Sequence, residues 1–281
     1  MKCYATLFVN WLIGDNGYFE QLLNKRLWPE MGLQHGGFDL PLQGHKEAAV
    51  RIKEAGLRCS IHLPFYGVNT GSLDQKRWRK SQDILLKALD IAALYDPDHL
   101  IAHPEFQPGL DSAVSGGAPG AISAHAGNTP SLGWLEASAK AWGEVLNVSP
   151  ARLYLENTSD QSPAALLELL KLLPPRAALC FDVGHWHYAA EGSVRRNLPQ
   201  WIETVAPRLG HLHLHDNDGG SDQHRGIGLG GIDYSFLVEL LRRHSLKPTF
   251  TLEAHHQADL DRSLAWLSQL PPEAPLEGLT D

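Results

Sequence analysis

Cysteine is scarce in this chain, and long apolar runs are absent. The three cysteines among 281 residues, Cys3, Cys59 and Cys180, lie in apolar, strand-like runs and form no metal-spaced pair. We interpret them as small buried residues of a protein from a reducing compartment. No stretch approaches about 18 uninterrupted apolar residues, so no membrane span is expected. The N-terminal run MKCYATLFVNWLIGDNG lacks the cleavage site of a signal peptide and is interpreted as a first strand. These absences predict a cytoplasmic protein.

Basic residues are also fewer than acidic ones: the chain has 24 Lys and Arg, 32 Asp and Glu, and a net charge of -8. This balance argues against nucleic acid as the main partner, because a nucleic-acid surface must neutralise many phosphates. No GxGxxG turn follows the first predicted strand, which argues against a dinucleotide-binding sheet. What is present is 43% hydrophobic residues, enough apolar material for a sizeable core.

Short apolar runs alternate with amphipathic segments along the chain, the pattern of parallel β-α-β units. Strands are predicted at 3–9, 32–35, 58–65, 99–106, 152–158, 177–185, 211–217 and 248–255, of which 32–35 is the weakest. Helices are predicted at 46–55, 75–95, 132–145, 163–173, 198–206, 234–244 and 259–270. Eight strands favour a closed barrel over an open sheet, whose two edges would need protection.

Because no linker divides the chain, we expect an α/β protein with a single (β/α)8 TIM-barrel domain over residues 1–281. The stretch 107–130, rich in Gly, Ala, Ser and Pro, is interpreted as a long loop after the fourth strand. Its composition leaves a lid, a subunit contact and a tolerated insertion open.

The stretch HLHLHDNDGGSDQHRGIGLGGID at 211–233 holds four histidines and four aspartates. It opens as a strand in which His211, His213 and His215 share one face. A single histidine in such a place is best interpreted as a satisfied core or surface residue. At this density, however, imidazole and carboxylate groups indicate a metal site, since they are ligands of zinc, manganese and iron.

Residues of the same kinds end nearly every predicted strand, and the C-terminal strand ends of a TIM barrel carry its chemistry. The metal-ligand candidates are His62, His103, Glu156, Asp182, His185, His213, Asp222, His224 and Glu253. Any one of them alone could simply cap the following helix. Together they would converge on one pocket, where carboxylates without a cation would repel each other, so a bound metal is the simplest explanation.

These motifs resemble the xylose-isomerase-like TIM-barrel superfamily, which holds sugar (phosphate) isomerases and epimerases as well as endonuclease IV. The resemblance covers essentially the whole chain and is strongest in LHDNDGGSDQHRGIGLGGID. Likeness to the isomerases implies one divalent metal bound by Glu156, Asp182, His213 and Glu253. It also implies that Glu156 and Glu253 act as acid and base, and that His185 holds oxygens of the substrate.

Likeness to endonuclease IV implies instead that all nine candidates bind three zinc ions in a phosphodiesterase acting at abasic sites. The spacings D-x-x-H at 182/185 and D-x-H at 222/224 suit either enzyme. Endonuclease IV resemblance also calls for basic and wedge residues in the strand-end loops, and the loop HGGFDLPLQGH contains no Arg or Lys. The isomerase is therefore ranked first, with zinc or manganese as the expected cofactor and one to three ions per chain.

The expected substrate is a small sugar or sugar phosphate. Arg225, or Arg195 with Arg196, is a candidate for holding a phosphate, although a solvated surface role is the simpler interpretation of an arginine. Phe65 and Trp186 are candidate pocket walls, as are Trp11 and Tyr66, although simple packing explains aromatics equally well. A barrel that binds metal or sugar without turnover is the third alternative. The identity of the sugar and a homo-oligomeric state stay open.

Overall fold

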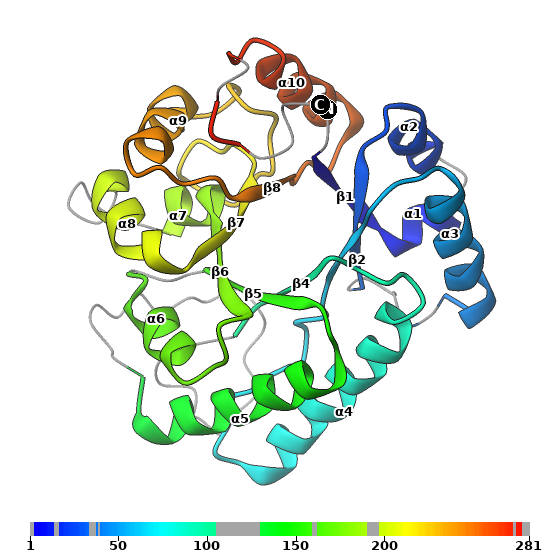
Figure 1. Ribbon diagram of the computed structural model, residues 1–281, viewed down its shortest axis with the longest axis vertical. Coiled ribbons are helices and arrows are strands. Elements are labelled where there is room, and N and C mark those ends of the chain that lie inside the picture. Colours follow the sequence, from blue (N-terminus) through cyan, green and yellow to red (C-terminus); the bar gives the residue numbers. More distant parts are fainter. Residues whose placement is uncertain are drawn as a thin grey trace.

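The computed structural model describes residues 3–13, 17–33, 38, 40–104, 130–158, 162–189, 197–271 and 274–276. Within them, eight parallel strands pair in chain order and close on themselves, with β1 beside both β2 and β8. The strands are β1 Tyr4–Phe8, β2 Trp28–Gly32, β3 Ser60–His62, β4 His99–Ala102, β5 Arg152–Glu156, β6 Ala177–Asp182, β7 Leu209–Leu214 and β8 Thr249–Leu252. Figure 1 looks down this barrel, with the helices forming an outer ring. The predicted (β/α)8 TIM barrel is thus confirmed.

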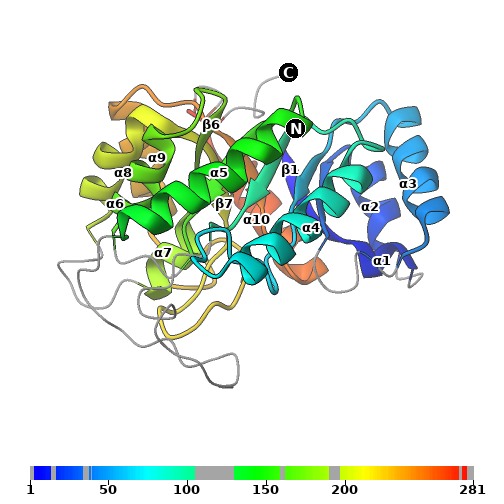
Figure 2. The same ribbon diagram turned by 90° about the horizontal axis from the view of Figure 1, so that it is seen from below.

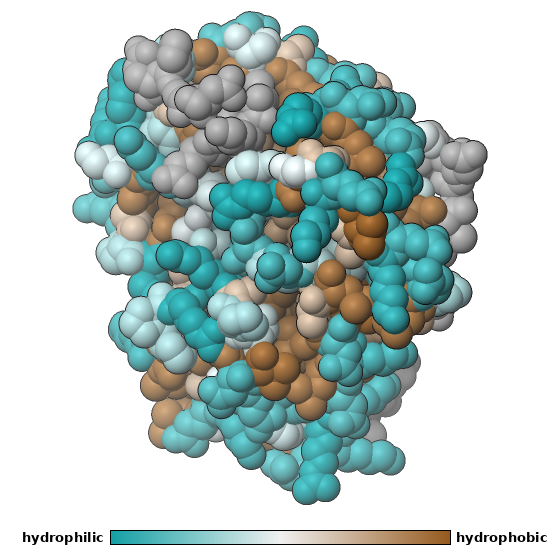
Figure 3. Space-filling view, turned by 45° about the vertical axis from the view of Figure 1, so that its right-hand side comes forward, coloured by the Kyte–Doolittle hydropathy of each residue, from teal (hydrophilic) through white to brown (hydrophobic). Residues whose placement is uncertain are grey.

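The helices of the described residues pack around the strands. They are α1 Val9–Ile13, α2 Tyr18–Asn24, α3 Leu42–Glu54, α4 Gln75–Ala92, α5 Leu132–Val148, α6 Ala164–Lys171, α7 Val183–Ala189, α8 Leu198–Val205, η2 Ala206–Arg208, α9 Tyr234–Arg243 and α10 Gln257–Leu267. Their polar faces look outward, and polar side chains cover most of the face in Figure 3. None of the helices described is long and apolar enough to cross a lipid bilayer.

Side chains along each strand alternate between the apolar layer under the helices and the inside of the barrel. One set of strand positions points outward to the helices and joins a large apolar core, for example Leu155, Leu212 and Phe250. The other set points into the barrel, where Ile101, Tyr154 and Cys180 form only a small apolar cluster. The other inward positions are mostly polar: Thr6, Glu30, Ser60, His62, His99, Glu156, Asp182, His211, His213, Thr249 and Thr251. The barrel interior is therefore built mainly of polar groups.

The second strand and several strand ends differ from the sequence predictions. The strand predicted at 32–35 is wrong in position, since β2 runs from Trp28 to Gly32. The sequence pattern does not identify this strand, because Pro29 and Glu30 interrupt the apolar run that is typical of a barrel strand. The strand predicted at 177–185 ends at Asp182, where α7 begins and the Asp182 carboxylate accepts the backbone N–H of His185 at 2.6 Å. Of the predicted loop 107–130, only residue 130 lies within the described residues.

The loop after β7 has a defined local structure. Asp216 and Arg225 form an isolated antiparallel bridge across it. The Asp216 carboxylate accepts backbone N–H groups of Asn217, Gly228 and Ile232 at 2.9–3.2 Å. Figure 2 shows this loop, in yellow, on the same side of the barrel as α1 and α7, which also follow strand ends. The loop is thereby held over the C-terminal ends of the strands.

Candidate metal centre

Four of the predicted ligands meet at one buried point. The Nδ1 atom of His213 lies 3.0 Å from Glu253 Oε2, 3.3 Å from Glu156 Oε1 and 3.7 Å from Asp182 Oδ2. Among the described residues, both ring nitrogens of His213, Glu156 Oε1 and Glu253 Oε2 have no hydrogen bond of normal geometry. Buried polar atoms without partners are costly. Their convergence fits a divalent cation, which these four residues could hold; we call them the primary set.

The negative charges of the carboxylates around this point are balanced by protonated histidine side chains. Burial would raise the pKa of Glu156 and of Asp182, but the surrounding histidines hold both well below the usual range. Burial would lower the pKa of His185 and of His213, but the acidic groups around them raise both well above the ordinary value. Without a metal, the carboxylates are thus compensated by protons on imidazole rings. A divalent cation would supply the same positive charge and displace those protons.

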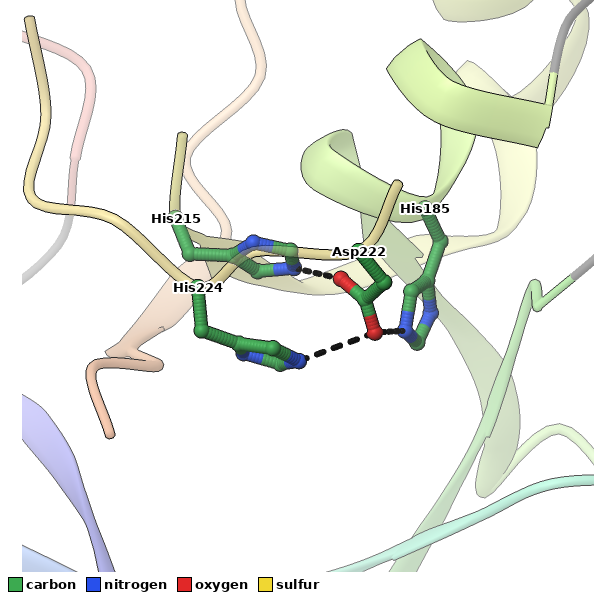
Figure 4. Close-up of side chains that lie close together, drawn as sticks. All are labelled: His185, His215, Asp222 and His224. Atoms are coloured by element: carbon green, nitrogen blue, oxygen red, sulfur yellow. Dashed lines mark hydrogen bonds and ion pairs between the residues drawn. The ribbon is translucent and has the colours of Figure 1, made fainter. Parts of the chain in front are cut away.

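A second cluster lies on the β7 loop side and is drawn in Figure 4. Asp222 is at its centre, 3.3 Å from His185 Nε2, 3.0 Å from His224 Nε2 and 3.7 Å from His215 Nε2. The ligand-type atoms of these four residues all lie within 4.8 Å of one another. Burial opposes a charge on His224, but the Glu253 and Asp222 carboxylates raise its pKa to about 9. His215 was not among the predicted ligands, although its strand position places it on the same face as His213.

A third cluster joins the two remaining predicted ligands to the primary set. His62 Nε2 and His103 Nε2 lie 3.1 Å and 3.2 Å from Glu156 Oε2. Glu156 therefore faces this cluster with one oxygen and the primary set with the other. The structure thus brings all nine predicted metal ligands together in three adjoining groups.

Glu30 is a neighbour of the primary set that the sequence analysis missed. Its side chain comes from the middle of β2 and is buried inside the barrel, 3.0 Å from Nε2 of His213. The signal that could have found it is a glutamate inside the short strand WPEMG, between Leu27 and Leu33. With the second strand predicted at 32–35, this residue appeared to lie in the segment before that strand.

The predicted substrate-binding residues take different positions. His185 belongs to the second cluster, and half-buried Phe65 stacks on His103 with ring centroids 4.4 Å apart. Trp186 is 6% exposed and packs against Phe181 in the apolar core. Arg225 is partly exposed, with its guanidinium 3.6 Å from Asp218. Arg195 and Arg196 lie outside the described residues.

A cavity of about 280 Å³ lies beside the end of β8. It is lined by Trp11, Tyr18, Gln21, His255, His256 and Gln257. The ring of His255 stacks on that of His224 with centroids 3.7 Å apart, so the cavity adjoins the second cluster. Burial lowers the pKa of His255 to about 4, and this ring is neutral at physiological pH.

Residues 27–270 match the family model of the xylose isomerase-like TIM barrel. The chain belongs to this family. Among curated proteins, it is 22% identical over 210 residues to the uncharacterized protein MJ1311 of Methanocaldococcus jannaschii, a match covering 72% of this chain and 66% of that protein. It is 20% identical to MJ1614 of the same organism, with 89% of this chain and 91% of that protein covered.

Solved structures of the same fold include a D-tagatose 3-epimerase-like protein, with a TM-score of 0.75, 19% identity and 96% of each chain covered. Another is the TTHB071 protein of Thermus thermophilus soaked with ZnCl2, with a TM-score of 0.71, 25% identity and coverage of 98% and 99%. The family resemblance predicted from the sequence motifs is confirmed.

Proposed function

We propose that the protein is a divalent-metal-dependent isomerase or epimerase of a small sugar or sugar phosphate. The observation that carries this proposal is the primary set, in which three carboxylates and one imidazole nitrogen converge at the C-terminal end of the barrel. Zinc and manganese both suit such a donor set. Family membership supports the proposal, as does the likeness to a D-tagatose 3-epimerase-like structure.

The primary set offers two groups for proton transfer. A divalent cation bound there would polarise a carbonyl and the neighbouring hydroxyl as a Lewis acid. Glu156 ends β5 and Glu253 directly follows β8, and these two strands lie on either side of β7, which carries His213. One glutamate would take the proton from the carbon next to the carbonyl to give an enediolate, and the other, itself protonated, would donate its own proton to the enediolate from the other side. His185 would hold a substrate hydroxyl, and the cavity beside β8, walled by Trp11, would take the rest of the sugar.

A zinc phosphodiesterase related to endonuclease IV is the second candidate. The observation in its favour is the presence of the two further clusters, which complete the nine residues that a three-zinc enzyme would use. The net charge of -8 argues against it, because a DNA-binding surface needs positive charge to replace counterions.

The test is incubation of the metal-loaded protein with ketopentoses, ketohexoses and their phosphates in D2O, followed by NMR. We expect an epimer or aldose product that carries deuterium at the carbon next to the carbonyl. With a chelator present, neither the product nor the deuterium label should appear. Glu156→Gln and Glu253→Gln should each abolish turnover. His244→Ala, at an exposed position after α9, is the matched control and should keep it. Cleavage of abasic-site DNA without sugar turnover would favour the phosphodiesterase instead.

A further inference from the structure

Glu30 is a charged group in the interior of the barrel, with 1% of its surface exposed. A carboxylate in such a place needs hydrogen-bond donors for both oxygens. Its Oε2 atom accepts the hydroxyls of Ser60 at 3.0 Å and Thr251 at 2.8 Å. Its Oε1 atom lies 3.0 Å from Nε2 of His213, a member of the primary set. The two hydroxyls thus fix the carboxylate so that its free oxygen faces one imidazole nitrogen.

The direction of this contact follows from the chemistry of the groups. An ionised carboxylate only accepts hydrogen bonds, so at this 3.0 Å contact the ring nitrogen that faces Glu30, Nε2, must carry a proton. Without a metal, the other ring nitrogen, Nδ1, carries the second proton of the imidazolium; once a cation displaces that proton, Nδ1 presents a lone pair. Nδ1 is the atom that faces Glu156 and Glu253 at 3.3 Å and 3.0 Å. Either this proton or a cation must therefore lie between Nδ1 and the two carboxylates.

The hydrogen bonds below Glu30 run in the same fixed direction. The Thr251 hydroxyl gives its proton to Glu30, so the Thr251 oxygen accepts from Nε2 of His211 at 2.9 Å. The Nδ1 atom of His211 lies 2.7 Å from the Thr249 hydroxyl oxygen, which is also 3.3 Å from the carbonyl oxygen of Gly210. Three strands, β2, β7 and β8, are joined by this chain of bonds. The position of Glu30 is therefore held by the barrel itself and not by a mobile loop.

We propose that Glu30 is a positioning residue of the metal centre, which holds His213 with its proton on Nε2 and its Nδ1 lone pair directed at the cation. The inference rests on the proposed function only in requiring a cation at the primary set. Carboxylates that accept the second ring N–H of a metal-bound histidine commonly strengthen metal binding, and their loss weakens it about 10- to 100-fold.

Glu30→Gln tests this role at constant size. The Ser60 and Thr251 hydroxyls would keep the amide oxygen, which turns the amide NH2 toward His213. Because an NH2 group donates, His213 Nε2 would have to accept, and the proton would move to Nδ1, where it competes with the cation. We expect zinc affinity, measured by competition with a chromophoric chelator, to fall about 10- to 100-fold. Ser60→Ala, the matched control, removes one bond to Oε2 and leaves the His213 contact, so its effect should be far smaller.

Ring ¹H–¹⁵N spectra of the zinc-loaded wild-type protein give a readout that needs no folded Glu30 variant, with His213→Asn for assignment. We expect a slowly exchanging Nε2–H signal for His213 and zinc on Nδ1. The opposite arrangement, or unchanged zinc affinity in Glu30→Gln, would overturn the role of Glu30 and leave the proposed function standing. Zinc binding with these signatures but without turnover on any sugar would remove the proposed function and leave Glu30. A wild-type protein that binds no zinc would overturn both.

Discussion

Removal of the cation should lower the thermal stability of this barrel by a calculable amount. The primary set takes one residue each from strands β5, β6 and β7 and the residue that follows β8, so a bound cation would cross-link half of the barrel. The unfolded chain does not assemble this set. Binding to the folded state alone contributes about 2.7 kcal/mol when the free cation is at about 100 times its Kd. For a chain of this size, that corresponds to a rise in Tm of about 5–10 °C.

The assay is a series of melting curves followed by circular dichroism, after dialysis against a chelator and re-addition of zinc or manganese. Each tenfold increase of free cation above Kd should add about 1.4 kcal/mol. Glu253→Gln should flatten this dependence, whereas His244→Ala should retain it. A wild-type Tm that stays constant from the chelated state to a large excess of cation would refute the reasoning.

Four further outcomes are expected. Gly184→Ala should destabilise the fold by about 1–3 kcal/mol in urea titrations, because a Cβ atom there would lie 2.0 Å from Cε1 of His215. His103→Ala should leave one cation per chain and raise KM in an isomerase, whereas elemental analysis would show a lost ion in a three-zinc enzyme. Phe65→Ala should raise KM several-fold through loss of the stacking on His103, worth about 1 kcal/mol, with unchanged metal content. Cation binding should release protons and strengthen as pH rises. Burial lowers the pKa of His213, but the acidic groups around it raise that pKa by more, so a proton must leave Nδ1 before the cation binds. Calorimetry in buffers of different ionisation enthalpy counts the protons released.

The barrel and most of the candidate metal centre were predictable because their signals are local. An acidic residue that ends an apolar run, such as Glu156 or Asp182, marks both the end of a strand and the position of a candidate ligand. Parallel strands that pair in chain order then bring these ends together at one side of the barrel. Strand alternation was enough to put His213 and His215 on one face. It was not enough to show that His215 lies 3.7 Å from Asp222, which depends on the path of the loop after β7.

Glu30 was missed for the opposite reason. Its signal is the hydrogen bonds to Ser60 and Thr251, which lie 30 and 221 residues away along the chain. Within its own strand, Glu30 follows Pro29 and breaks the apolar pattern by which a barrel strand is identified. Trp186 shows the same limit, since nothing local distinguishes a pocket wall from a core residue packed against Phe181.

The separation of the apolar layer from the inside of the barrel explains how this barrel tolerates so many buried charges. Outward strand residues such as Leu155, Leu212 and Phe250 are fully buried under the helices, and this layer supplies the apolar burial that folding requires. The inward positions are therefore not needed for apolar packing. They can hold a continuous polar network from His211 through Glu30 to the primary set. Within it, Glu30 and His211 are hydrogen-bonded to residues of other strands, so their burial costs little only while those partners are present. Closure of the barrel therefore also assembles the candidate metal centre, since the strands that carry its residues supply the hydrogen bonds that orient them.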